Sequence, residues 1–349
     1  MLRVAVVGAT GAVGREVCRL LDERVPEVGA LVPFASAASA GRDLAAEWGL
    51  RTPTAPVGAV DGDAIAGADV AVLCAGIGVS LALGDDLAAS GCLVVDNSSA
   101  FRMRDDVPLV VPEVNPEAIA TRPASGIVAN PNCSTIQLVR VLDPLRRAAG
   151  LEAVDVATYQ AASGGGLRGL AEVQAATADL LAGGDGGGGR GGRFGQPLAL
   201  NLVPQIGALD GDGMAHEEHK LRREPRKILA LPELRVTATA VRVPVLHCHS
   251  EAVTLRLGRP VPREGLEAVL AATSGLCVHR SSDRPPFPMP RFVARCDDGR
   301  ARVHVGRVRV DAEDPRTVQC WIVADNLWVG AALNATGILA HAVGRGWLG

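Results

Sequence analysis

The chain has 349 residues, more than one hydrophobic core usually organises, so we expect two domains. Hydrophobic residues make up 48% of the chain and aromatic residues only 3%, which predicts cores of small and branched aliphatic side chains. The formal net charge is -3, and no stripe of Lys and Arg interleaves with aromatics, which argues against nucleic acid as a partner.

The N-terminal sequence MLRVAVVGATGAVG has an apolar run too short for a signal peptide or a membrane span, so we expect a cytoplasmic protein with no membrane partner. Residues 2–7 predict a short strand, which leads through glycines into an amphipathic helix. Five further short apolar runs end in turn residues: 29–36, 68–76, 91–99, 108–115 and 126–133. Such strands alternating with helix-length segments predict an α/β, Rossmann-type doubly wound domain with a parallel sheet.

The pattern changes from Leu151 onward, where residues 234–245 and 249–257 alternate and predict an α+β domain with a mixed sheet. The glycine-rich segment 183–195 predicts a surface loop, since no strand leads into it as a phosphate-binding loop requires. A periodic C-terminal segment predicts a helix that returns to the first domain. We therefore expect a dinucleotide-binding domain over 1–133, completed by 325–349, and a catalytic and dimerisation domain over 134–324.

Gly8, Gly11 and Gly14 lie between the first predicted strand and the first predicted helix. Such a turn lets backbone N–H groups approach a pyrophosphate at the helix N-terminus, although a tight structural turn would also need glycine. Ser36 and Ser39 stand where an NAD-binding protein carries an acidic residue for the ribose 2′-hydroxyl. This favours NADP as the cofactor.

Eight cysteines occur at positions 18, 74, 92, 133, 248, 277, 296 and 320, without a CxxC pair or zinc-like spacing to His. We therefore expect reduced thiols and no metal site. Cys133 differs from the others because Asn-Pro-Asn precedes it and a helix-like segment follows it. A thiol at a helix N-terminus has its thiolate stabilised by the helix dipole, so Cys133 is the predicted nucleophile.

Six segments occur in an order and at separations that resemble the aspartate-semialdehyde dehydrogenase family from near residue 2 to near residue 340. They are NPNCST, TYQAASGGG (158–166), NLVPQI (201–206), EEHK (217–220), VRVPVLHCHSE (241–251) and ADNL (324–327). The resemblance implies reversible NADPH-dependent conversion of 4-aspartyl phosphate to aspartate 4-semialdehyde and phosphate. This phosphorylating aldehyde dehydrogenase (oxidoreductase) reaction serves the biosynthesis of lysine (through diaminopimelate), threonine, methionine and isoleucine.

The resemblance also implies roles for individual residues. Cys133 would form the acyl thioester, Gln160 would orient the acyl group, and His249 would be the acid/base. Arg242 would bind the substrate α-carboxylate, and Glu217 the α-amino group, unless Glu217 is only a solvated charge on a helix. Arg242 and His249 would face opposite sides of one unbroken strand, so Pro244 is predicted to interrupt it.

Further contacts follow from the same resemblance. Arg102, in SSAFRM, and Lys220 match the phosphate-binding pair of the family, and Asn132 adjoins the nucleophile as a substrate contact. The implied cofactor contacts are Gly8, Thr10, Gly11, Ala12, Val13, Gly14, Ser36, Ala38, Ser39, Ser163, Gly164 and Asn326. The family also implies a homodimer or homotetramer, built through the sheet of the second domain.

The sequence departs from the family pattern at two places. Ala38 replaces the arginine that contacts the 2′-phosphate, so NAD is an alternative to NADP unless Arg42 substitutes. Trp328 and Val329 replace a basic residue near the expected nicotinamide contact. Both changes are consistent with a paralogue of altered cofactor or substrate preference.

Three other interpretations are open. An N-acyl-glutamyl-phosphate reductase uses similar chemistry, but it tends to have glycine before and an aromatic after its cysteine, where this chain has Asn132 and Ser134. A glyceraldehyde-phosphate-type dehydrogenase would carry an SCTTN-like motif, which is missing from the sequence. A non-catalytic cofactor-binding protein is disfavoured, because each implied reacting residue is retained.

Overall fold

The computed structural model describes residues 1–186 and 192–348. The chain forms two units, one made of 1–132 and 331–349 and the other of 133–330. The sequence places the boundaries after residues 133 and 324. Within the described ranges, no helix is long and apolar enough to cross a membrane.

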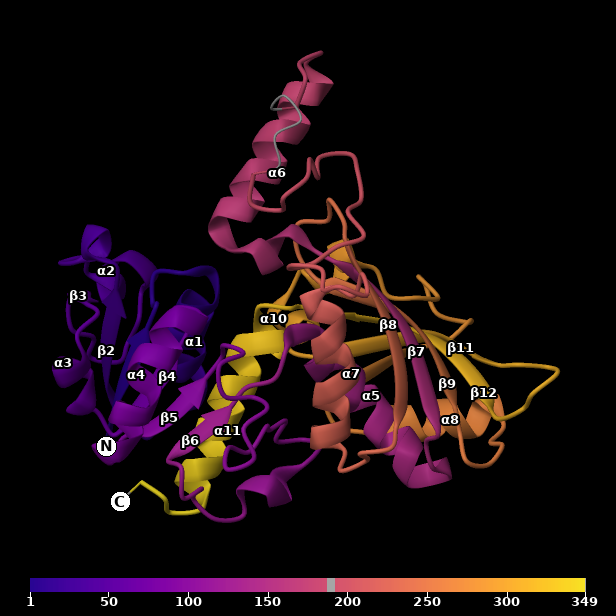
Figure 1. Cartoon of the computed structure of the whole chain (residues 1–349), viewed down its shortest axis with the longest axis horizontal. Helices are drawn as coiled ribbons and strands as arrows, with labels where there is room; N and C mark the ends of the chain where they lie inside the picture. The colour runs from indigo at the N-terminus through magenta and orange to yellow at the C-terminus, as the bar shows by residue number, and fades with distance from the viewer. Residues whose placement is uncertain (187–191, 349) are drawn as a thin grey trace. The chain divides into compact units, whose positions relative to one another are not determined.

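The first unit contains a six-stranded sheet in the order β3-β2-β1-β4-β5-β6, and every pairing is parallel (Figure 1). Its strands are β1 (Leu2–Val7), β2 (Val28–Ala35), β3 (Gly58–Ala59), β4 (Val70–Leu73), β5 (Leu93–Asp96) and β6 (Ile127–Ala129). β4 and β5 are buried along their whole length, as expected for strands covered on both faces. The predicted doubly wound fold is confirmed.

Helices cover this sheet. They are α1 (Ala12–Arg24), η1 (Ala37–Ser39), α2 (Leu44–Trp48), α3 (Gly62–Ala66), α4 (Ile77–Ala89), η2 (Pro116–Ile119) and α11 (Leu333–Gly344). α1 contacts β1, β2 and α11, while α4 contacts β4, β5 and β6. The C-terminal helix α11 therefore packs within the same unit as the first 132 residues.

One predicted strand of the first unit is wrong. Residues 108–115 form only an isolated bridge, from Leu109 to Ala129, and then turn through a Val114 N–H to Val111 O bond of 2.8 Å. The Asn115 side chain accepts from the N–H of Val111 and donates to the O of Leu109, both at 2.9 Å. One amide side chain thus satisfies part of this backbone, and the bridge to Ala129 of β6 is the segment's only pairing among the described residues.

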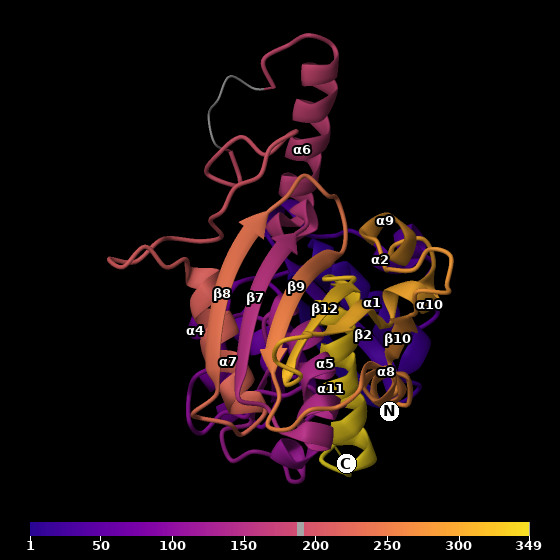
Figure 2. The same cartoon turned by 90° about the vertical axis from the view of Figure 1, so that its right-hand side faces the viewer.

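The second unit contains a mixed sheet in the order β10-β11-β12-β9-β7-β8, as predicted. Its strands are β7 (Ala153–Gln160), β8 (Arg235–Arg242), β9 (His249–Arg256), β10 (Leu276–His279), β11 (Val303–Val310) and β12 (Thr317–Ala324). β7 with β8 and β10 with β11 are parallel pairs, and the remaining pairs are antiparallel. Figure 2 looks onto one face of this sheet.

The helices of the second unit are α5 (Cys133–Ala149), η3 (Ala162–Gly165), α6 (Gly166–Leu181), α7 (His216–Ile228), α8 (Arg263–Ala271), α9 (Pro290–Val293) and α10 (Asp297–Arg300). The π-helical turn η4 (Trp328–Ala332) spans the boundary to the first unit. α5, α7 and α8 all contact the sheet, and α5 also contacts both of the other helices, while α6 projects beyond the strand ends (Figure 2). Of the predicted glycine-rich loop, 187–191 lie outside the described residues, and 183–186 and 192–195 form no helix or strand.

Candidate active site

Three of the predicted site residues stand in one row across the second sheet. Gln160, the last residue of β7, is paired with Arg242, the last residue of β8. On the other side of β7, Tyr159 is paired with Ser250, so His249 begins β9 at the same end. Because β7 and β8 are parallel and β9 runs against them, two strand ends and one strand start meet at this edge.

The predicted interruption at Pro244 is confirmed. β8 ends at Arg242 and β9 begins at His249, and Cys248 takes a positive φ of 70° between them. A Cβ added to Gly164 would lie 2.8 Å from Arg242 Nη1 and 3.5 Å from His249 Nε2. Both side chains therefore reach one point over the backbone of Gly164, where only glycine leaves room for them.

His249 is held as a neutral imidazole. Its Nδ1 accepts a 3.0 Å hydrogen bond from the N–H of Ala161, so the ring proton resides on Nε2. Burial, reinforced by the charge of Arg242 and opposed by Glu217, lowers the pKa of His249 to about 3. The ring therefore offers a donor at Nε2. Taking a proton from a hydroxyl, the role implied by the resemblance, would need a lone pair at Nε2 instead.

Arg242 is buried, and its Nη1 donates to the O of Ala161 at 2.8 Å. Its guanidinium lies 5.6 Å from the ring centroid of Phe194, within the range of a cation–π contact. Burial lowers the pKa of Arg242, and electrostatic interaction with Glu217 and Cys133 opposes that shift. The guanidinium is thus a desolvated cation near both groups, suited to an anionic substrate group.

Gln160 and two residues of α7 form a buried polar network. Gln160 Nε2 donates to Glu217 Oε1 at 3.1 Å and makes a close contact with Ser134 Oγ. Lys220 Nζ lies 2.9 Å from Glu217 Oε2. Glu217 is only 6% exposed, so it is not a solvated helix charge. Gln160 Oε1 is buried and accepts no hydrogen bond from the described part of the chain.

Cys133 is the first residue of α5 and is partly exposed, while Ser134 and Thr135 behind it are fully buried. A Cβ on Gly330 would lie 2.6 Å from Cys133 Cβ, so glycine is required against Cys133. By contrast, burial raises the pKa of the Cys18 and Cys320 thiols to about 12. Those two thiols stay protonated, as expected of structural cysteines.

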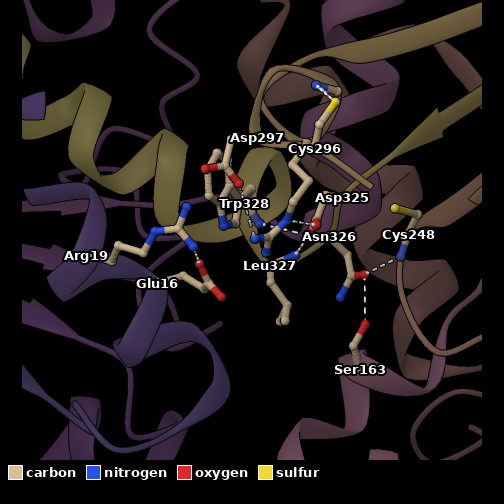
Figure 3. A network of polar contacts seen from close by, with 12 residues as sticks. Glu16, Arg19, Ser163, Cys248, Cys296, Asp297, Asp325, Asn326, Leu327 and Trp328 are labelled. Atoms are coloured by element: carbon tan, nitrogen blue, oxygen red, sulfur yellow. Dashed lines mark hydrogen bonds and ion pairs between the residues drawn. The ribbon is translucent and has the colours of Figure 1, made fainter. Parts of the chain in front are cut away.

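Asn326 lies two residues after the end of β12. Its side chain links the segment of Ser163 to the segment of Cys248. Its Oδ1 accepts from Ser163 Oγ at 2.9 Å and from the N–H of Cys248 at 3.2 Å, as Figure 3 shows. Ser163 and Asn326 are 1% and 3% exposed. The structure therefore joins two of the predicted cofactor contacts of the second unit by a direct hydrogen bond.

Trp328 and Val329 are fully buried. The guanidinium of Arg300 lies 4.3 Å from the centroid of the Trp328 ring, and its Nε bonds to Asp325 Oδ2 at 2.7 Å. Figure 3 shows Trp328 beside Asp325 in this network. A basic group is therefore present at this position, supplied by α10 and not by the segment after Asn326.

The glycine turn of the first unit has the form that a nucleotide site needs. Gly8 has φ +87°, and a Cβ on it would lie 2.8 Å from the backbone of Cys74. A Cβ on Gly14 would lie 2.2 Å from Gly8 O. Gly11 precedes α1, which begins with Ala12 and Val13, so backbone N–H groups at its start are available to a phosphate. These residues fit a dinucleotide.

The segment after β2 adds side chains to that turn. Ser39 Oγ lies 3.4 Å from Thr10 Oγ1, which brings two of the predicted cofactor contacts together. Ser36 and Ala38 are exposed beside it. Arg42 bonds to Glu47, with Nε 3.0 Å from Oε1. Because Arg42 is engaged in this ion pair, the positive charge expected opposite a 2′-phosphate is partly neutralised.

Arg102 and Asn132 lie in the first unit and are each 6% exposed. Arg102 Nε donates to Asn130 O at 2.9 Å, and its Nη2 donates to Asn97 O at 3.0 Å. Neither residue is a solvated surface side chain. Asn132 immediately precedes Cys133 in the chain.

Three residues that build the site are not predicted by the sequence patterns. Ala161 fixes both His249 and Arg242 through its backbone, Ser134 contacts Gln160, and Gly330 packs against Cys133. Ser134 and Ala161 occur inside the segments NPNCST and TYQAASGGG, which is the signal that could have found them. Gly330 lies far from these segments, and only the folded chain reveals its role.

Comparison with known proteins agrees with this geometry. A model described as semialdehyde dehydrogenase, NAD binding domain, matches residues 3–122, and one described as semialdehyde dehydrogenase, dimerisation domain, matches 142–329. These matches define the class as a two-domain semialdehyde dehydrogenase.

An aspartate-semialdehyde dehydrogenase from Synechocystis sp. is 40% identical over 353 residues, covering 99% of each chain. The crystal structure of aspartate semialdehyde dehydrogenase II complexed with ASA from Vibrio cholerae has a TM-score of 0.89, 38% identity and 98% coverage of both chains. The aspartate semialdehyde dehydrogenase with NADP from Candida albicans has a TM-score of 0.75, 26% identity and 99% coverage of both chains. The chain belongs to the aspartate-semialdehyde dehydrogenase family.

Proposed function

We propose that the chain is a reversible, NADP-dependent enzyme that converts 4-aspartyl phosphate to aspartate 4-semialdehyde and phosphate. The observation that carries the proposal is the row of Arg242, Gln160 and His249 at one strand edge, with Gln160 in contact with Ser134, the residue after Cys133. This row combines a carboxylate-binding cation, an amide and an imidazole donor near one thiol. Those groups are what a thioester-forming reduction of an amino-acid side chain requires.

In the reductive direction, the Cys133 thiolate attacks the acyl carbon of the acyl phosphate, the C–O bond to phosphate breaks, and a thioester forms. Lys220 and Arg102 are the predicted cations for the departing phosphate. The nicotinamide cofactor, when bound, supplies the hydride for thioester reduction and takes it back in the reverse direction. When the tetrahedral oxyanion collapses, the C–S bond breaks, which releases the aldehyde and restores the thiolate.

His249 supports both directions as a neutral donor. The charge on the substrate oxygen arises when hydride or the thiolate adds to the carbonyl carbon, so no proton has to be removed from that oxygen. An Nε2–H group stabilises the oxyanion by a hydrogen bond. The Ala161 N–H at 3.0 Å keeps the ring in the tautomer that provides this donor.

The α-carboxylate and α-amino groups of the substrate are assigned to charged residues of the second unit. Arg242 offers a planar fork for the carboxylate. Glu217 and the open acceptor Gln160 Oε1 offer oxygen atoms to an ammonium group. A longer N-acylated substrate has no ammonium group to meet these acceptors, which disfavours an N-acyl-glutamyl-phosphate reductase.

NADP is the proposed cofactor, and NAD is the alternative. The segment from Ser36 to Ser39 offers hydroxyl groups and no carboxylate, so nothing there repels a 2′-phosphate. Ala38 offers no cation, and Arg42 is paired with Glu47. The preference for NADP is therefore expected to be smaller than a dedicated arginine would give.

The proposed assembly is a homodimer, or a tetramer containing that dimer, formed through the open face of the second sheet (Figure 2). Tyr159 and Trp321 present an aromatic pair there, with centroids 5.5 Å apart, and Tyr159 is 37% exposed. An exposed aromatic pair on a sheet face is typical of a subunit interface. We also assign the enzyme to the cytoplasm, because all eight cysteines are free thiols.

The experiment that tests the activity measures nicotinamide reduction by the purified protein with aspartate semialdehyde and phosphate, using NADP and NAD in parallel. Cys133→Ala is expected to lower turnover by more than about 10⁴-fold. Cys320→Ala, which removes a buried thiol on β12, is the matched control and should keep turnover. A folded protein without turnover with either cofactor would overturn the proposed reaction and favour a non-catalytic or altered paralogue.

A further inference from the structure

A second group of sulfur and imidazole ligands lies outside the proposed active site, on the parallel pair β10 and β11. Cys277 and His279 are two residues apart on β10, so both side chains point to one face. Cys277 is paired with His304 of β11, and His279 with Gly306. A Cβ on Gly306 would lie 2.7 Å from Pro288 Cδ and 3.3 Å from His279 Cβ, so glycine is needed opposite His279 for close packing.

We propose that Cys277, His279 and His304 form a binding site for one divalent transition-metal ion of the zinc class. Their ligand atoms all lie within 4.8 Å of one another. His279 Nε2 is 3.0 Å from His304 Nδ1 and 3.8 Å from Cys277 Sγ. Tetrahedral zinc with ordinary bond lengths places two nitrogens about 3.3 Å apart and a nitrogen and a sulfur about 3.6 Å apart. The two distances from His279 Nε2 therefore stand close to the spacing that coordination needs.

A backbone carbonyl orients one of the ligands. His304 Nε2 donates to Gly299 O at 2.9 Å, which leaves the Nδ1 lone pair facing His279. Histidine ligands of zinc are commonly fixed in this way, by a hydrogen bond from the ring nitrogen that does not bind the metal. Without metal, a proton between His279 and His304 bridges the two nitrogens, and the ion would take the place of that proton.

The surroundings suit an ion of intermediate softness. One sulfur and two imidazole nitrogens favour zinc, cobalt or a similar ion over magnesium or calcium, which prefer oxygen. His304 is 8% exposed, while Cys277 and His279 are partly exposed and provide a path of entry. The fourth position is left to water.

The sequence does not reveal this group because His304 lies 25 residues beyond His279. Only the register of β10 against β11 brings His304 opposite Cys277. The site is independent of the proposed dehydrogenase activity, since it shares no residue with the row at the ends of β7, β8 and β9.

The test is a titration with Co²⁺ of the full chain carrying Cys133→Ala, which removes the proposed nucleophile as a competing ligand. We expect one equivalent of cobalt to produce a thiolate-to-cobalt charge-transfer band, and one equivalent of Zn²⁺ to abolish that band. Cys277→Ser in the same background should lose the band. Cys296→Ser, which changes an exposed cysteine next to α10, is the matched control and should retain it.

Folding is checked by circular dichroism in the absence of metal. If Cys277→Ser is unfolded, His279→Asn serves as the second variant, and it should bind Zn²⁺ more than about tenfold more weakly in a competition assay. Absence of the band at equimolar cobalt in the parent would overturn the proposal. Persistence of the band in the folded Cys277→Ser protein, or unchanged zinc affinity in folded His279→Asn, would do so as well.

Discussion

The two proposed binding regions of the chain, the turn after β1 and the strand edge of the second unit, use different chemical groups. The turn after β1 is made of backbone, and glycines at positions 8, 11 and 14 allow that backbone to pack closely. The strand edge of the second unit is made of buried polar side chains, namely Gln160, Arg242 and His249, all at most 7% exposed. The first region depends on the absence of Cβ atoms, and the second depends on mutual hydrogen bonds and charge.

Substitutions in the two regions should therefore have different effects. A substitution in the glycine turn introduces a steric clash, which acts on packing and on the unfolding free energy. A substitution in the strand-edge row leaves buried polar partners unsatisfied and removes groups that contact the reacting atoms.

Replacing His249 with Asn should lower kcat by about 10²- to 10⁴-fold, because the Nε2–H donor to the substrate oxygen is lost. Steady-state kinetics in both directions measure the effect. His247→Asn, two residues earlier in the loop between β8 and β9, should retain activity. Equal losses in the two variants would show that loop structure, and not the imidazole donor, is responsible.

Replacing Arg242 with Lys should lower kcat/KM for aspartate semialdehyde by about 30- to 1,000-fold, mainly through KM, since the bidentate fork is lost at a buried site (roughly 2–4 kcal/mol). Arg235→Lys, at the exposed start of the same strand, is the control and should change little. A tenfold or larger effect in both variants would place the cause in β8 as a whole.

The neutral state of His249 predicts how stability depends on pH. Its folded pKa of about 3 lies below the ordinary histidine pKa of 6.5, so the unfolded chain binds the extra proton between these values. This group therefore contributes a loss of stability as pH falls from about 6.5 to about 3, with a slope of at most about 1.4 kcal/mol per pH unit. Urea unfolding at several pH values, compared with His249→Asn, should show a shallower slope in the variant.

Replacing Gly14 with Ala should lower the free energy of unfolding by about 1–3 kcal/mol, because the added Cβ would lie 2.2 Å from Gly8 O. Cofactor affinity should fall as well, as measured by quenching of tryptophan fluorescence. Gly78→Ala in α4, where no atom lies within 4 Å of the new Cβ, should instead stabilise by about 0.5–1 kcal/mol. Similar destabilisation by both changes would contradict the steric explanation.

Replacing Ser163 with Ala should have the smallest effect. The change removes the 2.9 Å hydrogen bond to Asn326, worth about 1 kcal/mol, and should raise the KM for the cofactor about fivefold with little change in kcat. Initial rates at varied cofactor concentration measure this. A change confined to kcat would place Ser163 in the chemistry and not in cofactor binding.

The regularities of the sequence predicted the architecture well, because apolar runs and alternation report directly on burial. The parallel sheet, the mixed sheet and the break between Arg242 and His249 follow from such patterns. The wrong strand at 108–115 was just as apolar, but the Asn115 side chain satisfies its backbone locally. Periodicity cannot distinguish a segment paired by a strand from one paired by a side chain.

Contacts between distant segments were beyond prediction. The tautomer of His249 depends on the backbone of Ala161, and the basic group over Trp328 comes from Arg300 in α10. The group of Cys277, His279 and His304 depends on strand register. Each of these needs the spatial alignment of elements that the sequence separates by more than twenty residues.

The contact between Gly330 and Cys133 has a consequence for the connectivity of the chain. These two residues are the last and the first of the second unit, and only the missing Cβ of Gly330 lets them touch. The second unit is therefore inserted into the chain of the first unit, and the two ends of the insertion touch. Once the second unit has folded, it joins residues 132 and 331 of the first unit at a chain-entropy cost as small as that of a short loop. Cys133, the proposed nucleophile, occupies one of the two points where the chain passes between units, so the same residue would serve as linker and reactive group.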